Sequence, residues 1–184
     1  MKAGGGVGEK KRRTGRGCRR RGLFITFEGG EGCGKSTHSA LLYDYLRARG
    51  IPCVRTFEPG GTTVGKAIRR ILLDPANTGL GVTAELLLFE ASRAQLIGEV
   101  IAPALAAGAV VLCDRFTDAT IAYQVYGGGM PLAAVRDIER WSVNGVCPDK
   151  TFLLEVSVST GLARAKGEDR FERKERLFHQ RVQQ

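Results

Sequence analysis

The amino-acid sequence predicts an α/β protein in which a parallel β-sheet carries helices on both faces. Short apolar runs rich in strand-forming residues alternate along the 184 residues with segments whose apolar residues recur at helical spacing. A glycine-rich loop joins the first apolar run to the first helical segment. Hydrophobic residues make up 43% of the chain, which is ordinary for one globular domain.

The predicted elements have clear start and stop signals. The first apolar run, residues 23–27, is a predicted strand, and Gly50 ends the helical pattern that follows the glycine-rich loop. The turn "EPGGT" separates the second strand from a short helix. Thr83 is the expected N-cap of a long helical stretch that Gly108 ends. We expect further strands at 51–57, 109–114 and 151–156, and further helices at 64–73, 83–107, 131–143 and 173–182.

The positive charge is concentrated at the N-terminus. Residues 1–22 contain nine Lys or Arg residues and one Glu, so they contribute +8 of the formal net charge of +9. This segment has almost no apolar residues to offset the entropy of ordering. We therefore expect a basic disordered extension, followed by a single domain over residues 23–184. Contact with nucleic acid through the clustered charges is the alternative to a merely solubilising extension.

The cysteines, histidines and apolar runs exclude several classes of protein. The five cysteines are odd in number and contain no C-x-x-C pair, which predicts reduced thiols in a cytoplasmic protein. The two histidines, His38 and His179, are too few and too far apart for a zinc site or a histidine-based triad. The longest apolar run, residues 100–113, is too short to span a membrane.

The glycine-rich loop has the pattern Gly29-x-x-x-x-Gly34-Lys35-Ser36 between a predicted strand and a predicted helix. Glycines let backbone N–H groups turn toward a polyphosphate, and the N-terminus of the next helix favours negative charge. Lys35 adds a charge for the β and γ phosphates, and Ser36 adds an oxygen for Mg²⁺. A chance glycine-rich loop is the alternative. The predicted ATP phosphate-binding residues are Gly29, Gly30, Glu31, Gly32, Cys33, Gly34, Lys35, Ser36 and Thr37.

Asp114 ends the predicted strand "VVLCD", about 80 residues after the loop. A carboxylate at the end of a neighbouring strand can hold Mg²⁺ and its waters beside bound phosphates. A helix N-cap is the alternative role for this side chain. Together with the loop, Asp114 indicates a nucleoside triphosphatase or kinase that binds ATP and Mg²⁺, and leaves the acceptor open.

Five motifs together resemble the thymidylate kinase family. They are "FEGGEGCGKST", "EPGGT", "LLLFEASRAQL", "DRFTDATIAYQ" and "DRFE", in that family's order over residues 22–182. The resemblance implies a P-loop kinase fold of three layers, ATP-dependent phosphorylation of dTMP to dTDP in dTTP biosynthesis, and a homodimer formed through the helix from Thr83. The rival interpretations are another nucleotide or deoxynucleoside kinase of the same fold, or a catalytically impaired nucleotide-binding module.

The resemblance also implies where dTMP binds. Phe89 would stack under thymine, while a core position on an amphipathic helix is the alternative. Arg93, one helical turn further on, would reach a carbonyl of the base. Arg115 would bind the acceptor phosphate through two N–H groups, with a surface ion pair as the alternative. The other implied contacts are Glu31 with the sugar 3′-hydroxyl, Pro59 with the thymine methyl, Thr120 with the base edge, Tyr123 with the 2′ position, and Gln124 as a supporting polar contact.

A lid around residues 161–172 is implied to close over ATP. Its segment "RAKGEDR" contains Arg164, Lys166 and Arg170, for which a solvated charge run is the alternative. Some members of the family have an arginine in the glycine-rich loop, and this chain has none. The lid must then supply the cations that phosphoryl transfer needs. The implied catalytic residues are Lys35, Arg115, Arg164, Lys166 and Arg170, and the implied metal contacts are Ser36, Asp114 and Glu172.

Two departures from the family pattern carry expectations. Phe57 stands where many relatives have an arginine before "EPGGT", which removes one cation near the acceptor. The family also continues past the lid helix into another strand and helix, whereas this sequence ends at Gln184. We therefore expect a domain that is incomplete at its C-terminus and is less stable, or binds ATP more weakly, than a full-length relative.

Overall fold

Four parallel strands form the centre of the molecule. The computed structural model describes residues 21–165 and 169–183. All three strand pairings in this part of the chain are parallel, which confirms the predicted α/β class. The strands form one sheet in the order β2-β3-β1-β4, with the bounds β1 Phe24–Glu28, β2 Cys53–Phe57, β3 Val110–Asp114 and β4 Lys150–Leu153.

The carboxyl ends of the strands meet at one edge of the sheet. Phe27 of β1 and Phe57 of β2 both lie opposite Asp114 of β3. Glu28 and Asp114, the last residues of β1 and β3, therefore lie at the same edge. In open parallel sheets, ligands bind outside this edge.

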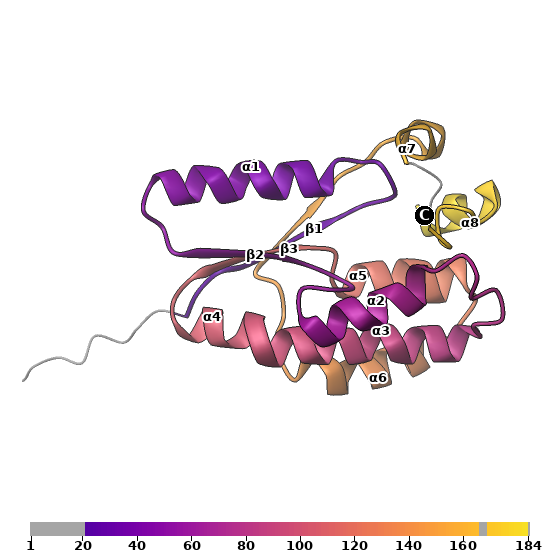
Figure 1. The fold of residues 1–184 in the computed structure, drawn as a ribbon, viewed down its shortest axis with the longest axis horizontal. Helices are drawn as coiled ribbons and strands as arrows, with labels where there is room; N and C mark the ends of the chain where they lie inside the picture. Colours follow the sequence, from indigo (N-terminus) through magenta and orange to yellow (C-terminus); the bar gives the residue numbers. More distant parts are fainter. Residues whose placement is uncertain (1–20, 166–168, 184) are drawn as a thin grey trace, which may run out of the picture.

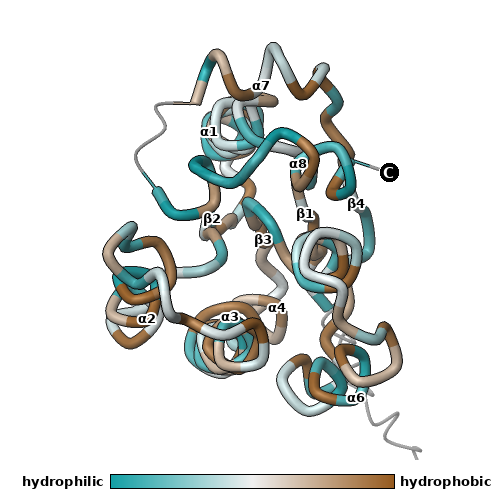
Figure 2. Tube along the Cα trace, turned by 90° about the vertical axis from the view of Figure 1, so that its right-hand side faces the viewer, coloured by the Kyte–Doolittle hydropathy of each residue, from teal (hydrophilic) through white to brown (hydrophobic). Residues whose placement is uncertain are grey.

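Helices cover both faces of the sheet, as Figure 1 shows. One face carries α1 (Lys35–Ala48), and the opposite face carries α3 (Val82–Leu96) together with α4 (Ala102–Ala106). The view in Figure 2 also has β1, β2 and β3 between α1 on one side and α3 and α4 on the other. This arrangement confirms the predicted three layers. The remaining helical segments are α2 (Thr63–Leu73), η1 (Ile97–Ile101), α5 (Thr117–Thr120), η2 (Ile121–Gly127), α6 (Leu132–Val143), α7 (Val158–Arg164) and α8 (Arg176–Val182).

The alternation of side chains along β1 explains why both faces are covered. Phe24 packs into a cluster with Leu96 and Ile101 on the α3 side of the sheet. Ile25 and Phe27 pack on the other side against apolar residues of α1. Successive side chains of a strand point to opposite faces, so a strand of continuous apolar sequence needs a helical layer on each face.

The predicted N-cap of the long helix is wrong. Helix α3 begins at Val82, after Gly81 in extended backbone, and no side chain caps it. Thr83 therefore already lies within the first turn. Gly108 does end the helical stretch, with a φ of 81° that a glycine adopts without strain. The short helix α7 was not predicted, although its N-cap Ser157 accepts a hydrogen bond from the backbone N–H of Thr160 at 3.1 Å.

The predicted disordered extension falls almost entirely on residues 1–20, which lie outside the described residues. Within residues 21–165 and 169–183, no helix is both long and apolar enough to cross a membrane.

Candidate active site

The glycine-rich loop connects β1 to α1 at the carboxyl edge of the sheet. Gly29, Gly32 and Gly34 all have positive φ angles. A Cβ atom at Gly29 would lie 2.2 Å from the backbone oxygen of Leu154, and one at Gly32 would lie 2.3 Å from that of Gly161. Only glycine fits at these two positions, because the backbone of another segment occupies the space that a side chain needs.

Lys35 is fixed in the mouth of this loop. Its Nζ donates to the backbone oxygens of Gly29 at 3.1 Å and Gly30 at 2.6 Å, and it lies 3.5 Å from the Cys33 thiol. Burial of the ammonium, and then the nearby charge of Arg115, lower the pKa of Lys35. The loop therefore holds a partly desolvated cation whose partners are two backbone carbonyls and the Cys33 thiol.

Ser36 and Asp114 join the loop to the end of β3. The Ser36 hydroxyl donates to Oδ2 of Asp114 over 2.5 Å, across 78 residues of sequence. Both side chains line a cavity of about 1000 Å³ above the loop. Other residues predicted to bind ATP, dTMP or metal, or to act in catalysis, also line this cavity: Glu31, Gly32, Gly34, Lys35, Thr37, Arg115, Arg164 and Glu172.

A second, smaller cavity of about 90 Å³ adjoins the first. All eight residues predicted to bind dTMP line it, namely Glu31, Pro59, Phe89, Arg93, Arg115, Thr120, Tyr123 and Gln124. The two cavities share a wall, because five residues line both of them: Glu31, Glu58, Arg69, Arg115 and Asp169. Sequence reasoning missed Arg69 and Asp169 as part of this wall.

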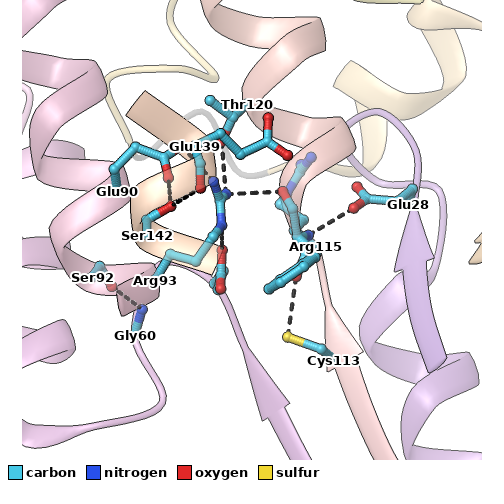
Figure 3. A network of polar contacts seen from close by, with 12 residues as sticks. Glu28, Gly60, Glu90, Ser92, Arg93, Cys113, Arg115, Thr120, Glu139 and Ser142 are labelled. Atoms are coloured by element: carbon cyan, nitrogen blue, oxygen red, sulfur yellow. Dashed lines mark hydrogen bonds and ion pairs between the residues drawn. The ribbon is translucent and has the colours of Figure 1, made fainter. Parts of the chain in front are cut away.

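Arg93 is the best-buried charged residue of the smaller cavity, with 1% of its surface exposed. Figure 3 shows its guanidinium at the centre of a polar network. It donates through Nε to Glu58 (2.8 Å), through Nη1 to Glu90 (2.5 Å), and through Nη2 to the Phe116 backbone oxygen (3.1 Å) and Thr120 Oγ1 (2.7 Å). Burial alone would lower the pKa of Arg93, but the charges of Glu58 and Glu90 outweigh it and raise that pKa.

Two buried glutamates, Glu58 in the shared wall and Glu28 at the end of β1, have raised pKa values. Burial raises the pKa of Glu58 to about 7 against the opposing charge of Arg93. Burial likewise raises the pKa of Glu28 to about 7, although Arg115 opposes the change and the Phe116 N–H donates to Glu28 over 2.7 Å. Glu58 Oε1 is buried without a hydrogen-bond partner among the described residues.

Arg115 lies where the loop and the smaller cavity meet. Its Nη1 donates to the Gly29 backbone oxygen at 3.1 Å, and its Nη2 forms an ion pair with Glu31 at 2.8 Å. The Tyr123 hydroxyl donates to the same Glu31 oxygen over 2.6 Å. Burial would raise the pKa of Glu31, but Arg115 and Tyr123 outweigh it and lower that pKa. The carboxylate therefore stays charged and orients the arginine.

An aromatic cluster of Phe89, Tyr123 and Phe171 also lines the smaller cavity. The ring centroids of Phe89 and Phe171 are 5.7 Å apart, and those of Tyr123 and Phe171 are 5.8 Å apart. Phe171 follows Arg170 in the predicted lid, so this segment lies against the acceptor side of the site. Sequence reasoning missed Phe171 as a residue of this pocket. Its ring neighbours lie on α3 and η2, and no local sequence pattern predicts such long-range contacts.

In this structure Arg170 contacts α2 and α3, and its predicted catalytic role stays a prediction. Its guanidinium donates through Nε to the Leu72 backbone oxygen at 2.9 Å and forms an ion pair with Glu85. It is absent from the described lining of the larger cavity, whereas Arg164 is part of that lining. The buried carboxylate of Glu85 therefore pairs with Arg170 in this structure. The predicted catalytic residue Lys166 lies outside the described residues.

The combined site joins a lysine-bearing phosphate loop to a second cavity with an arginine at the boundary. Phosphate loops of this type bind nucleoside triphosphates, and an adjoining cationic and aromatic pocket provides for an acceptor nucleotide. Fold and site together define a P-loop nucleotide kinase.

Comparisons with known proteins specify the class further. The family model described as thymidylate kinase matches residues 27–184. A thymidylate kinase of Halothermothrix orenii is 50% identical over 170 residues, which cover 89% of this chain and 82% of that relative. A thymidylate kinase of Trichlorobacter lovleyi is 49% identical over 169 residues, covering 87% of this chain and 80% of that relative. The crystal structure of thymidylate kinase from Ehrlichia chaffeensis has a TM-score of 0.73 and 35% identity, covering 89% of this chain and 78% of that structure. The chain belongs to the thymidylate kinase family.

Proposed function

We propose that the larger cavity binds ATP, that the smaller cavity binds dTMP, and that the γ-phosphoryl group passes between them at their shared wall. As a member of the thymidylate kinase family, the chain is an ATP-dependent kinase that phosphorylates dTMP to dTDP. The observation that carries the proposal for the site is the position of Arg115. Its guanidinium contacts both the phosphate loop and the pocket residues Glu31 and Tyr123.

The phosphates of ATP are proposed to lie along loop residues 29–37. The loop N–H groups and the N-terminus of α1 favour negative charge at this position. Lys35 would exchange its carbonyl partners for phosphate oxygens, which are stronger acceptors for an ammonium group. Arg164 of α7 lines the same cavity and is the proposed lid cation.

Mg²⁺ is the proposed metal, held through Ser36, Asp114 and Glu172. These side chains line the larger cavity and offer oxygen ligands, which Mg²⁺ prefers. No group of three His, Cys, Asp or Glu side chains in the described ranges could hold a metal alone. This fits Mg²⁺, which keeps several waters and takes phosphate oxygens as further ligands. When bound, the ion would neutralise charge on the transferring phosphoryl group.

The thymine base is proposed to lie between Phe89 and the polar network of Arg93. Phe89 would stack on the base, and Arg93 would donate to a base carbonyl. Thr120 and Gln124 would complete the polar edge of the pocket, and Pro59 would contact the thymine methyl. Thr120 and Gln124 are buried and already bonded, to Arg93 and Glu85 respectively, so their orientations are set before the nucleotide binds.

The sugar and phosphate of dTMP are proposed to lie toward the shared wall. Glu31 would accept from the 3′-hydroxyl, and Tyr123 would crowd the 2′ position and favour deoxyribose. Arg115 would bind the acceptor phosphate, because a guanidinium can donate to two phosphate oxygens at once.

Catalysis in this proposal is positioning with charge neutralisation. The acceptor phosphate is already ionised, so its oxygen can attack without a strong protein base. Lys35, Arg115 and Arg164 are the proposed cations around the transferring group. We assign Arg170 the role of an anchor, because its contacts with Glu85 and Leu72 fix this segment beside the acceptor pocket.

The direct test measures which nucleoside monophosphate the protein phosphorylates, and how a substitution of Arg115 in the shared wall changes kcat. Purified protein with ATP and Mg²⁺ should phosphorylate dTMP in preference to dUMP, dCMP and UMP. A preference for UMP would overturn the role of Tyr123, and a preference for dCMP would overturn that of Arg93. Arg115→Lys should lower kcat strongly, because it keeps the charge and loses the paired donors. Arg140→Lys is the matched control, since Arg140 is an exposed residue of α6.

Three further expectations stay predictions. Pairing of two chains through α3 is supported by the exposed apolar side chains Val82 and Leu87 on that helix. Cytoplasmic location, and contact of the basic N-terminal segment with nucleic acid, rest on sequence composition alone.

A further inference from the structure

The Arg93 guanidinium donates to a carboxylate, Glu90, for which the sequence predicts no role. Glu90 lies one helical turn before Arg93 on α3, and its Oε1 accepts from Arg93 Nη1 over 2.5 Å. Its other oxygen, Oε2, accepts from the hydroxyl of Ser142 on α6. Only 3% of Glu90 and 8% of Ser142 is exposed. Figure 3 shows Ser142, Glu90 and Arg93 as one continuous chain of contacts.

The hydrogen bonds of Arg93 leave one N–H group for a ligand. A guanidinium group has five N–H donors in one plane. Among the described residues, Nε donates to Glu58, Nη1 donates once to Glu90, and Nη2 donates to both Phe116 and Thr120. The second N–H of Nη1 is the remaining donor, on a residue that lines the smaller cavity. Glu90 therefore holds the very nitrogen that carries the free donor.

Ser142 fixes the orientation of Glu90. Its hydroxyl lies within hydrogen-bonding distance of Glu90 Oε2 and is 2.9 Å from the backbone oxygen of Glu139. A hydroxyl has one proton, and a carboxylate is the stronger acceptor. Without this donor, Glu90 Oε2 would be a buried acceptor without a partner, and the carboxylate could rotate to find another. Rotation of Glu90 would remove the acceptor that holds Nη1, the nitrogen with the free donor, while Nε and Nη2 keep their partners.

We propose that Glu90 and Ser142 are positioning residues that aim the free N–H of Arg93 at a carbonyl group of the pyrimidine and thereby exclude a base with an amino group there. Thymine and uracil have a carbonyl where cytosine has an amino group, and two donors cannot pair with each other. The inference rests on the proposed role of Arg93 in base binding. It adds two specificity-determining residues to the proposed acceptor site, Glu90 of α3 and Ser142 of α6, neither of which is in the described lining of the smaller cavity.

The test measures kcat/KM for dTMP and dCMP as competing substrates, with ATP and Mg²⁺. Their ratio does not depend on the fraction of active protein, so a merely structural defect would leave it unchanged. Glu90→Ala should lower the ratio of dTMP to dCMP at least about tenfold, the effect of losing one charge-assisted hydrogen bond. Glu90→Gln should keep most of the ratio, because its amide oxygen can still accept from Arg93. Ser142→Ala should lower the ratio less than Glu90→Ala does.

Glu99→Gln is the matched control, since Glu99 is exposed and accepts from Gln95 one turn away. It should retain the wild-type ratio. An unchanged ratio in Ser142→Ala and in Glu90→Ala would overturn the inference. If Glu90→Ala does not fold, an unchanged ratio in Ser142→Ala alone would overturn it. Wild-type protein that fails to phosphorylate dTMP would overturn the proposed function itself, and the inference with it.

Discussion

The buried carboxyl of Glu58 should make the stability of this protein depend on pH in a defined direction. Burial raises its pKa from the ordinary 4.5 to about 7 in the folded chain. A carboxyl group with a raised pKa stabilises the fold fully below its unfolded pKa, and that stabilisation is lost as the pH rises through its folded pKa. The difference of about 2.5 between the two pKa values corresponds to about 3 kcal/mol.

The substitution Glu58→Gln removes this titration and keeps an oxygen that can accept from Arg93. The unfolding free energy of the variant minus that of wild type should therefore be about 3 kcal/mol higher at pH 8 than at pH 4.5. Urea unfolding at a series of pH values measures this difference. Glu99→Gln is the control for a carboxyl that is exposed. A constant difference between wild type and Glu58→Gln across the whole pH range would refute the reasoning.

Three further predictions concern the base pocket, the metal and the packing of the first turn of α2 against Gly60. Phe89→Ala should raise KM for dTMP about tenfold through lost stacking while KM for ATP stays the same, measured by steady-state kinetics. Chelation of divalent metal with EDTA should abolish phosphoryl transfer, and added Mg²⁺ should restore it; activity that persists would contradict a metal held at Asp114. Gly65→Ala should destabilise the fold by at least about 2 kcal/mol in urea unfolding, because its Cβ would lie 2.2 Å from the backbone oxygen of Gly60. Gly79→Ala, where a Cβ meets nothing within 4 Å, is its control.

The sequence reveals the parts of the site that depend on local pattern. The loop from Gly29 to Ser36 and the strand that ends at Asp114 follow from glycine spacing and from apolar runs bounded by stop signals. The eight acceptor residues that line one cavity came from the family resemblance, since composition alone would favour a core role for Phe89. Their individual functions stay predictions, to be tested by the variants above.

Long-range side-chain pairing accounts for what the sequence could not reveal. The ion pair of Arg170 and Glu85 joins residues 85 apart, and it removes Arg170 from the phosphate cavity. The contact of Ser142 with Glu90 spans 52 residues and links two helices. Neither pair has a periodic or local signature, because Ser142 and Glu90 meet where two helices pack, and Arg170 reaches Glu85 of α3 from a turn that follows α7 in the chain. The sequence around Arg170 therefore does not distinguish contact with solvent, with phosphate or with a buried glutamate.

The wall that the two cavities share has a consequence for the design of inhibitors. A single molecule that links a nucleoside to a polyphosphate would lie across Arg115 and Arg69, with its junction against side chains that belong to both cavities. Its two halves would bind with the advantage of a high effective concentration, because the connection between them is short. Substitutions of Arg115 that weaken such a molecule would also weaken the contact proposed for the acceptor phosphate. Resistance through this residue would therefore come with slower growth in a cell that depends on the enzyme.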